Sequence, residues 1–190
     1  EVTTVSKINT IADGTAVQTP GDKLFPYLQA NVDHVLTVDD SELTLSFLDM
    51  AENHKMIVEN SGLLTVAALK HLDFKGKKVV SVLSGGNMDV LTMATVVQNG
   101  LMQRDRIFTV SVMLPDKPGQ LAAVSSLIAK EQGNVIKLEH NVFANVNRTA
   151  GVELTITLES FGTEHKDQII KALEAAGYCP VITKTNGIYM

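Results

Sequence analysis

The chain has 190 residues, of which 45% are hydrophobic and 19% are charged, a composition typical of a folded globular protein with one large core or two small ones. The formal net charge is -5 and no basic run could follow a phosphate backbone, so no nucleic acid partner is expected. No membrane partner is expected either, because the longest apolar runs are far shorter than the ~20 residues that span a bilayer. The single cysteine, Cys179, cannot form an internal disulfide, and we therefore expect a cytoplasmic protein.

Residues 1–100 alternate short apolar runs with stretches of helical periodicity. The apolar runs predict strands at 33–38, 55–58 and 77–83. Because strands separated by helices form right-handed crossovers, this order predicts an α/β region with a mostly parallel sheet. The turns at 59–62 and 84–87 follow two of these strands, and open α/β sheets bind ligands beyond the carboxyl ends of their strands.

The polar segment at 98–106 marks a boundary, with a linker expected at 101–106. The pattern then predicts, in order, a strand, a helix, two strands, a helix and a strand, at 107–114, 121–133, 134–143, 152–160, 163–177 and 180–183. A polar hairpin connection is expected at 144–151. This β-α-β-β-α-β order predicts a ferredoxin-like domain over residues 107–190.

Three polar turns are candidates for a binding site. Ser84 and Gly85 end the apolar run of residues 79–83, Glu59 ends another, and Gly14 lies in the sequence "IADG". A carboxylate at the end of an apolar strand is costly unless it is partnered or hydrated. Each turn also has a plainer explanation, as a helix cap or a tight loop. The five histidines and the lone cysteine lack the spacing of metal ligands, so no metal is predicted.

Five sequence stretches taken in order carry a family resemblance: "TIADGTAV", "VENSG", "VVSVLSGGNMD", "LPDKPGQL" and "EQGNV". The first three resemble the catalytic domain of the threonine ammonia-lyase (threonine dehydratase) family, lyases with a pyridoxal 5'-phosphate cofactor and the tryptophan-synthase-β fold type. The last two resemble an ACT domain. The resemblance implies an incomplete α/β catalytic segment at 1–100, followed by a ferredoxin-like ACT domain at 107–190. It also implies an L-threonine/L-serine ammonia-lyase, which converts threonine to 2-oxobutanoate and ammonia by β-elimination.

The resemblance also implies roles for the residues of the three turns. The hydroxyl of Ser84 would meet the pyridine nitrogen of the cofactor, and Gly85 would let the backbone approach the ring edge. Gly14 and Glu59 would line the same pocket. The Schiff-base lysine of the family, in its Ser-x-Lys-x-Arg-Gly context, and its glycine-rich phosphate loop do not occur in the sequence. No catalytic residue is therefore assigned, and we expect this chain to be a C-terminal piece that by itself is inactive and without cofactor.

The ACT resemblance implies allosteric regulation by a small amino acid, such as a branched-chain one, bound where two copies pair in a homo-oligomer. The residues that match the effector site are Asp116, Gly119 and Gln120 in the loop, with Asn134 and Val135 opposite. An ACT fold that serves only for assembly is the plainer alternative. Two other functions stay open, a sister lyase or racemase on the same scaffold and a free-standing amino-acid-binding module.

Overall fold

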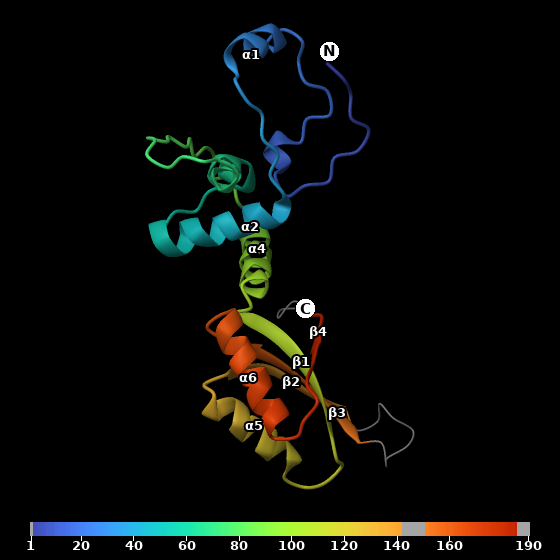
Figure 1. Cartoon of the computed structure of the whole chain (residues 1–190). Helices are drawn as coiled ribbons and strands as arrows, with labels where there is room; N and C mark the ends of the chain where they lie inside the picture. Colours follow the sequence, from blue (N-terminus) through green and yellow to red (C-terminus); the bar gives the residue numbers. More distant parts are fainter. Residues whose placement is uncertain (1, 142–150, 186–190) are drawn as a thin grey trace. The chain divides into compact units, whose positions relative to one another are not determined.

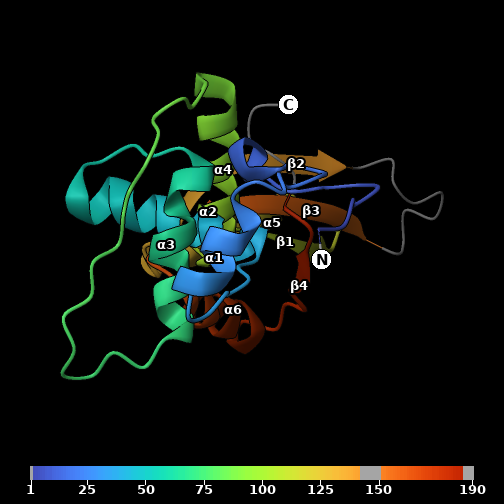
Figure 2. The same cartoon turned by 90° about the horizontal axis from the view of Figure 1, so that it is seen from above.

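The computed structural model describes residues 2–141 and 151–185 and divides into two compact units, Glu1–Gly100 and Leu101–Met190. Figures 1 and 2 show the chain from two sides. No helix among the described residues is long and apolar enough to cross a membrane.

The first unit is built from helices, short helical turns and extended segments. Its α-helices are α1 (Phe25–Asn31), α2 (Asp40–Asp49), α3 (Leu64–Ala67) and most of α4 (Val90–Gln103), whose last three residues belong to the second unit. Its helical turns are η1 (Asp13–Thr15), η2 (Met50–His54), η3 (Asn60–Leu63) and η4 (Ala68–His71). The N–H of Asp39 donates to Glu42 Oε2 at 3.0 Å, which closes a capping box at the start of α2. Helix α2 then buries Leu43 and Phe47 in one core with Leu63 of η3, and this core also contains Val58 and Val96.

The three strands predicted in residues 1–100 are not formed among the described residues. Residues 33–38, 55–58 and 77–83 have no regular secondary structure. Figure 2 shows the segment that leads from α3 to α4 as a long tube without a strand arrow. The side chains of Val35 and Val80 are 85% and 89% exposed. A strand needs a neighbour for its backbone hydrogen bonds, and no described segment of this unit pairs with these runs.

The second unit has the predicted ferredoxin-like order. Its elements are β1 (Ile107–Leu114), α5 (Gln120–Lys130), β2 (Asn134–Asn141), β3 (Val152–Glu159), α6 (Thr163–Ala175) and β4 (Val181–Thr183). The strands form one sheet in the order β2-β3-β1-β4, in which every neighbouring pair is antiparallel. The structure therefore confirms both the mixed α/β class and the β-α-β-β-α-β domain.

Helices α5 and α6 pack on one face of this sheet (Figure 1). Val110 pairs with Ile156 on β3, and both side chains are fully buried against Ile128 of α5 and Leu173 of α6. The other face carries hydroxyl side chains, because successive residues of a strand point to opposite faces.

The segment expected as a linker, 101–106, is ordered. Helix α4 continues to Gln103, and Arg106 accepts a backbone hydrogen bond from Ser160 N at 2.8 Å. The predicted hairpin connection at 144–151 lies outside the described residues except for Gly151.

Candidate functional site

The three polar turns of the first unit meet in space. An ideal Cβ on Gly85 would lie 2.1 Å from Glu59 Oε1, and one on Gly14 would lie 2.7 Å from Ser61 Oγ and 3.7 Å from Glu59 Oε1. We call residues 13–14, 59–62 and 84–87 the three-turn cluster. The structure thus brings together Gly14, Glu59 and Gly85, which the sequence analysis chose from separate stretches of the chain.

The local backbone explains why this approach is possible. Glu59 is extended, with φ -62° and ψ 154°, and the 3-10 turn η3 begins directly after it. The backbone of Gly62 then passes so close to the next loop that an added Cβ would lie 1.7 Å from the Ser84 carbonyl oxygen. Gly85 has φ +77°, a conformation that glycine adopts without the cost of a Cβ.

Glu59 is partnered by backbone groups of the 84–87 loop. Its own N–H donates to the Gly85 carbonyl oxygen at 3.4 Å, and its Oε2 accepts from Asn87 N at 3.1 Å. This second bond provides a partner for the carboxylate at the end of an apolar run.

The structure gives Gly85 a neighbour that the sequence did not indicate. The family resemblance implied that the missing side chain leaves room for the cofactor ring. Here the space beside Gly85 is filled by the carboxylate of Glu59, whereas a Cβ on Gly86 would meet no atom within 4 Å. The side chain of Ser84, between these contacts, is exposed.

The sequence analysis did not select two polar residues of the three-turn cluster, Asn60 and Ser61. Asn60 donates from Nδ2 to the carbonyl oxygen of Ile11 at 3.0 Å, while Asn60 Oδ1 and Ser61 Oγ are buried and have no hydrogen-bond partner among the described residues. Buried polar atoms without a partner are rare and mark a site that a water or ligand completes. The signal that could have indicated them is the polar turn at 59–62, which lies between the apolar run at 55–58 and an apolar helical stretch.

The predicted effector residues of the second unit fall into two groups that lie apart within one chain. Asp116, Gly119 and Gln120 follow the end of β1, where Leu114 pairs with Val152. Asn134 and Val135 begin β2, at the other end of the sheet.

The strand register fixes this separation. Asn134 pairs with Glu159, the residue of β3 that pairs with Ile107 at the start of β1. The eight residues of β1 span ~26 Å at about 3.3 Å per residue. The two groups therefore do not meet within one chain.

The contacts of these residues differ between the two groups. Gly119 precedes α5 with φ +88°, and a Cβ there would meet nothing within 4 Å. Asn134 donates from Nδ2 to Glu159 Oε2 at 3.0 Å, so its amide is already held by the neighbouring strand.

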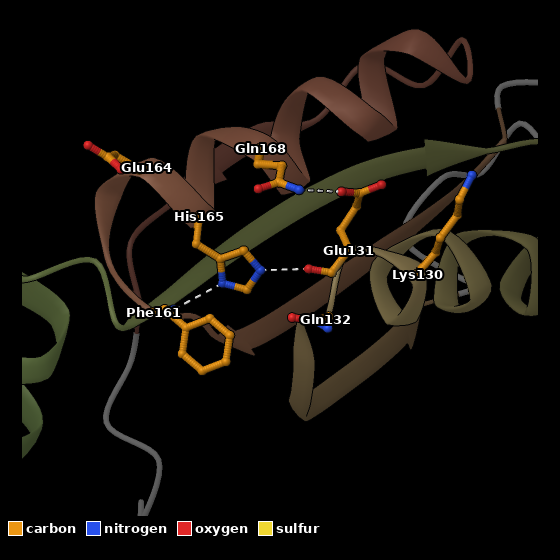
Figure 3. Close-up of a pocket in the computed structure, with 7 residues that line it drawn as sticks. All are labelled: Lys130, Glu131, Gln132, Phe161, Glu164, His165 and Gln168. Atoms are coloured by element: carbon orange, nitrogen blue, oxygen red, sulfur yellow. Dashed lines mark hydrogen bonds between the residues drawn. The ribbon is translucent and has the colours of Figure 1, made fainter.

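A cavity of about 500 Å³ in the second unit was not predicted from the sequence. It lies between the end of α5 and the start of α6 (Figure 3) and is lined by Lys130, Glu131, Gln132, Phe161, Glu164, His165 and Gln168. Phe161 N donates to His165 Nδ1 at 3.0 Å, so the other ring nitrogen, Nε2, carries the proton and donates to the Glu131 carbonyl oxygen at 2.6 Å. His165 thereby joins the start of α6 to the end of α5.

Within the part of the chain that the structure describes, no three side chains of metal-binding type come together.

Comparisons with known proteins match both halves of the chain. Residues 1–85 match the family profile described as pyridoxal-phosphate dependent enzyme, and residues 108–177 match that of the ACT domain. A curated L-threonine ammonia-lyase of Geobacter sulfurreducens is 36% identical over 178 residues, which are 92% of this chain and 44% of that protein. One of Thermotoga maritima is 34% identical over 170 residues, 89% of this chain and 42% of that protein. The chain thus spans less than half the length of these curated relatives.

Proposed function

Because the chain carries part of a pyridoxal-phosphate-dependent enzyme domain followed by an ACT domain, we propose that it contributes to an L-threonine/L-serine ammonia-lyase with an amino-acid-regulated activity. The proposed reaction is the β-elimination of threonine to 2-oxobutanoate and ammonia. The convergence of Gly14, Glu59 and Gly85 beside Ser84, within the matched residues 1–85, carries this proposal. The names of the curated relatives support the choice of substrate.

The residues of the three-turn cluster fit pyridoxal 5'-phosphate. Ser84 is exposed and its backbone is held on both sides, while Ser61 Oγ nearby is buried and has no hydrogen-bond partner in the described part of the chain. When bound, the cofactor supplies a ring that stabilises negative charge at the substrate Cα. Ser84 would hold the ring nitrogen through a neutral hydrogen bond, and the glycines at 14 and 85 would keep the backbone of the pocket close. A neutral hydroxyl, unlike a carboxylate, does not hold that nitrogen protonated.

The ACT unit is proposed to bind a small amino acid, such as a branched-chain one, between two copies in a homo-oligomer. The separation of the loop residues from Asn134 and Val135 within one chain supports a shared site, because a second copy can place its β2 beside the loop of the first. Two paired copies can adopt two arrangements. The effector changes the equilibrium between them, and with it the catalytic unit, only to the extent that it binds one arrangement more tightly than the other.

The chain by itself is proposed to be inactive and to purify without stoichiometric cofactor. The sequence contains no Ser-x-Lys-x-Arg-Gly motif, so no lysine in the family's context is present to form the Schiff base. A yellow preparation of the 190-residue chain that releases ammonia from threonine would overturn this part of the proposal.

A chimera tests the activity. The part of the Geobacter sulfurreducens enzyme that precedes its matched region is joined to this chain, and 2-oxobutanoate, ammonia and racemised serine are measured. We expect elimination of threonine, and weaker cofactor retention in Ser84→Ala because one hydrogen bond worth roughly 0.5–1.5 kcal/mol is lost. A folded chimera that binds the cofactor but only racemises serine, or is inert while the Geobacter parent is active, would refute the lyase assignment.

A further inference from the structure

We infer that Glu59 is a positioning residue, which binds the backbone of the 84–87 loop and so fixes Ser84, instead of contacting the cofactor with its carboxylate. The inference rests on the proposed function only for the role of Ser84. The contacts that carry it lie within this chain.

The first step is that Glu59 bonds the loop on both sides of Gly86. Its main-chain N–H donates to Gly85 O at 3.4 Å, and its Oε2 accepts from Asn87 N at 3.1 Å. A charged acceptor makes the second bond stronger than a neutral one. One residue therefore holds the backbone of the loop directly before and directly after Gly86.

The second step is that both carboxylate oxygens face the loop. A Cβ on Gly85 would lie 2.1 Å from Oε1 and 2.7 Å from Oε2, so the carboxylate packs directly against the Gly85 backbone. No other residue type fits at position 85 while Glu59 is in place. The positive φ of Gly85 adds a second, independent requirement for glycine.

The third step is that the same turn holds the loop from its other side. A Cβ on Gly62 would lie 1.7 Å from the Ser84 carbonyl oxygen and 2.8 Å from its carbon. The backbone of Ser84 and Gly85 is thus in contact with Gly62 at one residue and with Glu59 at the next. The place of the Ser84 hydroxyl follows from the turn at 59–62.

Hydrogen exchange in the whole 190-residue chain tests the contact without any cofactor. In Glu59→Ala the amide of Asn87 loses its acceptor, and we expect its exchange to accelerate roughly tenfold or more, the effect of losing a hydrogen bond to a charged group. Glu59→Gln keeps an acceptor oxygen and should stay within a few-fold of the parent chain. Exchange at Asn87 that is equally fast in the parent chain and in Glu59→Ala would overturn the inference.

A second experiment tests the packing of Glu59 against Gly85 by making the same substitution with and without the carboxylate. Gly85→Ala should lower the melting temperature of the parent chain more than it lowers that of Glu59→Ala, because removal of the carboxylate makes room for the new methyl group. Gly86→Ala is the matched control, since its Cβ would meet no atom within 4 Å. Equal effects of Gly85→Ala in both backgrounds would contradict the packing of Glu59 on Gly85.

The chimera distinguishes positioning from direct contact. If Glu59 acts through Ser84, Glu59→Ala should weaken cofactor binding in the parent chimera and add nothing in the Ser84→Ala background, and Glu59→Gln should restore binding. Additive losses would assign Glu59 to the cofactor itself and overturn the inference. A chimera that binds no cofactor would refute the proposed function, while the exchange measurement still decides the role of Glu59.

Discussion

Lys166 Nζ lies 2.8 Å from Asp105 Oδ1 and joins the segment after α4 to the first turns of α6. Thr163 Oγ1 donates to the other oxygen of the same carboxylate at 2.8 Å. Burial alone would raise the pKa of Asp105, but the hydrogen bonds from Lys166 and Thr163, together with the charge of Lys166, hold that pKa below its usual value.

This pair predicts a pH-dependent stability. Because the folded pKa of Asp105 is lowered, its stabilising contribution is complete above the unfolded value of about 3.9 and is lost as the pH falls through the folded pKa. Asp105→Asn should therefore cost roughly 1–2 kcal/mol near neutral pH and less below pH ~3. Urea unfolding at both pH values measures the difference, and a cost that does not change with pH would contradict the assignment.

The link made by His165 should stabilise the ACT unit. His165→Ala removes the partners of Phe161 N and the Glu131 carbonyl oxygen, and we expect a loss of about 1–2 kcal/mol, the value of bonds to partly exposed groups. Lys171→Ala, an exposed position on the same helix, serves as control and should stay within about 0.5 kcal/mol. Equal stability of the two variants in thermal unfolding would show that the link contributes nothing.

Gly62 should be intolerant of any side chain. Its Cβ would lie 1.7 Å from the Ser84 carbonyl oxygen, so Gly62→Ala must displace the 84–87 loop. Overpacking of this kind costs roughly 1–3 kcal/mol. The unfolding free energy of the chain measures the cost. Gly21→Ala is the matched control, because position 21, like position 62, has no positive φ, and a Cβ there would meet no atom within 4 Å. A Gly62→Ala chain as stable as the parent would contradict the close approach.

A mixing experiment tests the shared effector site. We expect calorimetric binding of isoleucine or valine to the chain, and loss of binding in both Gly119→Val and Asn134→Ala. If each site takes its loop from one copy and its β2 from the other, an equal mixture of the two variants should regain about a quarter of the parent sites, because half the dimers are mixed and each has one intact site. Sedimentation confirms that the variants still pair. If the mixture binds no more ligand than either variant alone, while the parent chain binds, the site lies within one copy.

The sequence alone determined most of the ACT unit. Strand β1 has the predicted bounds of 107–114, and the other strands and helices begin within one residue of their predicted starts. This was possible because the apolar residues of β1 and β3 alternate with a period of two and the connections described are short, so that local pattern and tertiary packing agree. The three motifs of the first unit came from resemblance, since Ser84, Glu59 and Gly14 by themselves are also ordinary turn residues.

Only the tertiary structure decided which strands form and which of the selected residues contact one another. The apolar run at 77–83 predicts a strand, yet no segment that the structure describes pairs with it. Strand formation depends on partners that a local pattern cannot supply. The contact of Glu59 with Gly85 joins positions 26 apart and depends on a left-handed glycine that no periodicity reveals. The split of the effector residues between opposite ends of the sheet follows from strand register, which is set when the sheet packs on its helices.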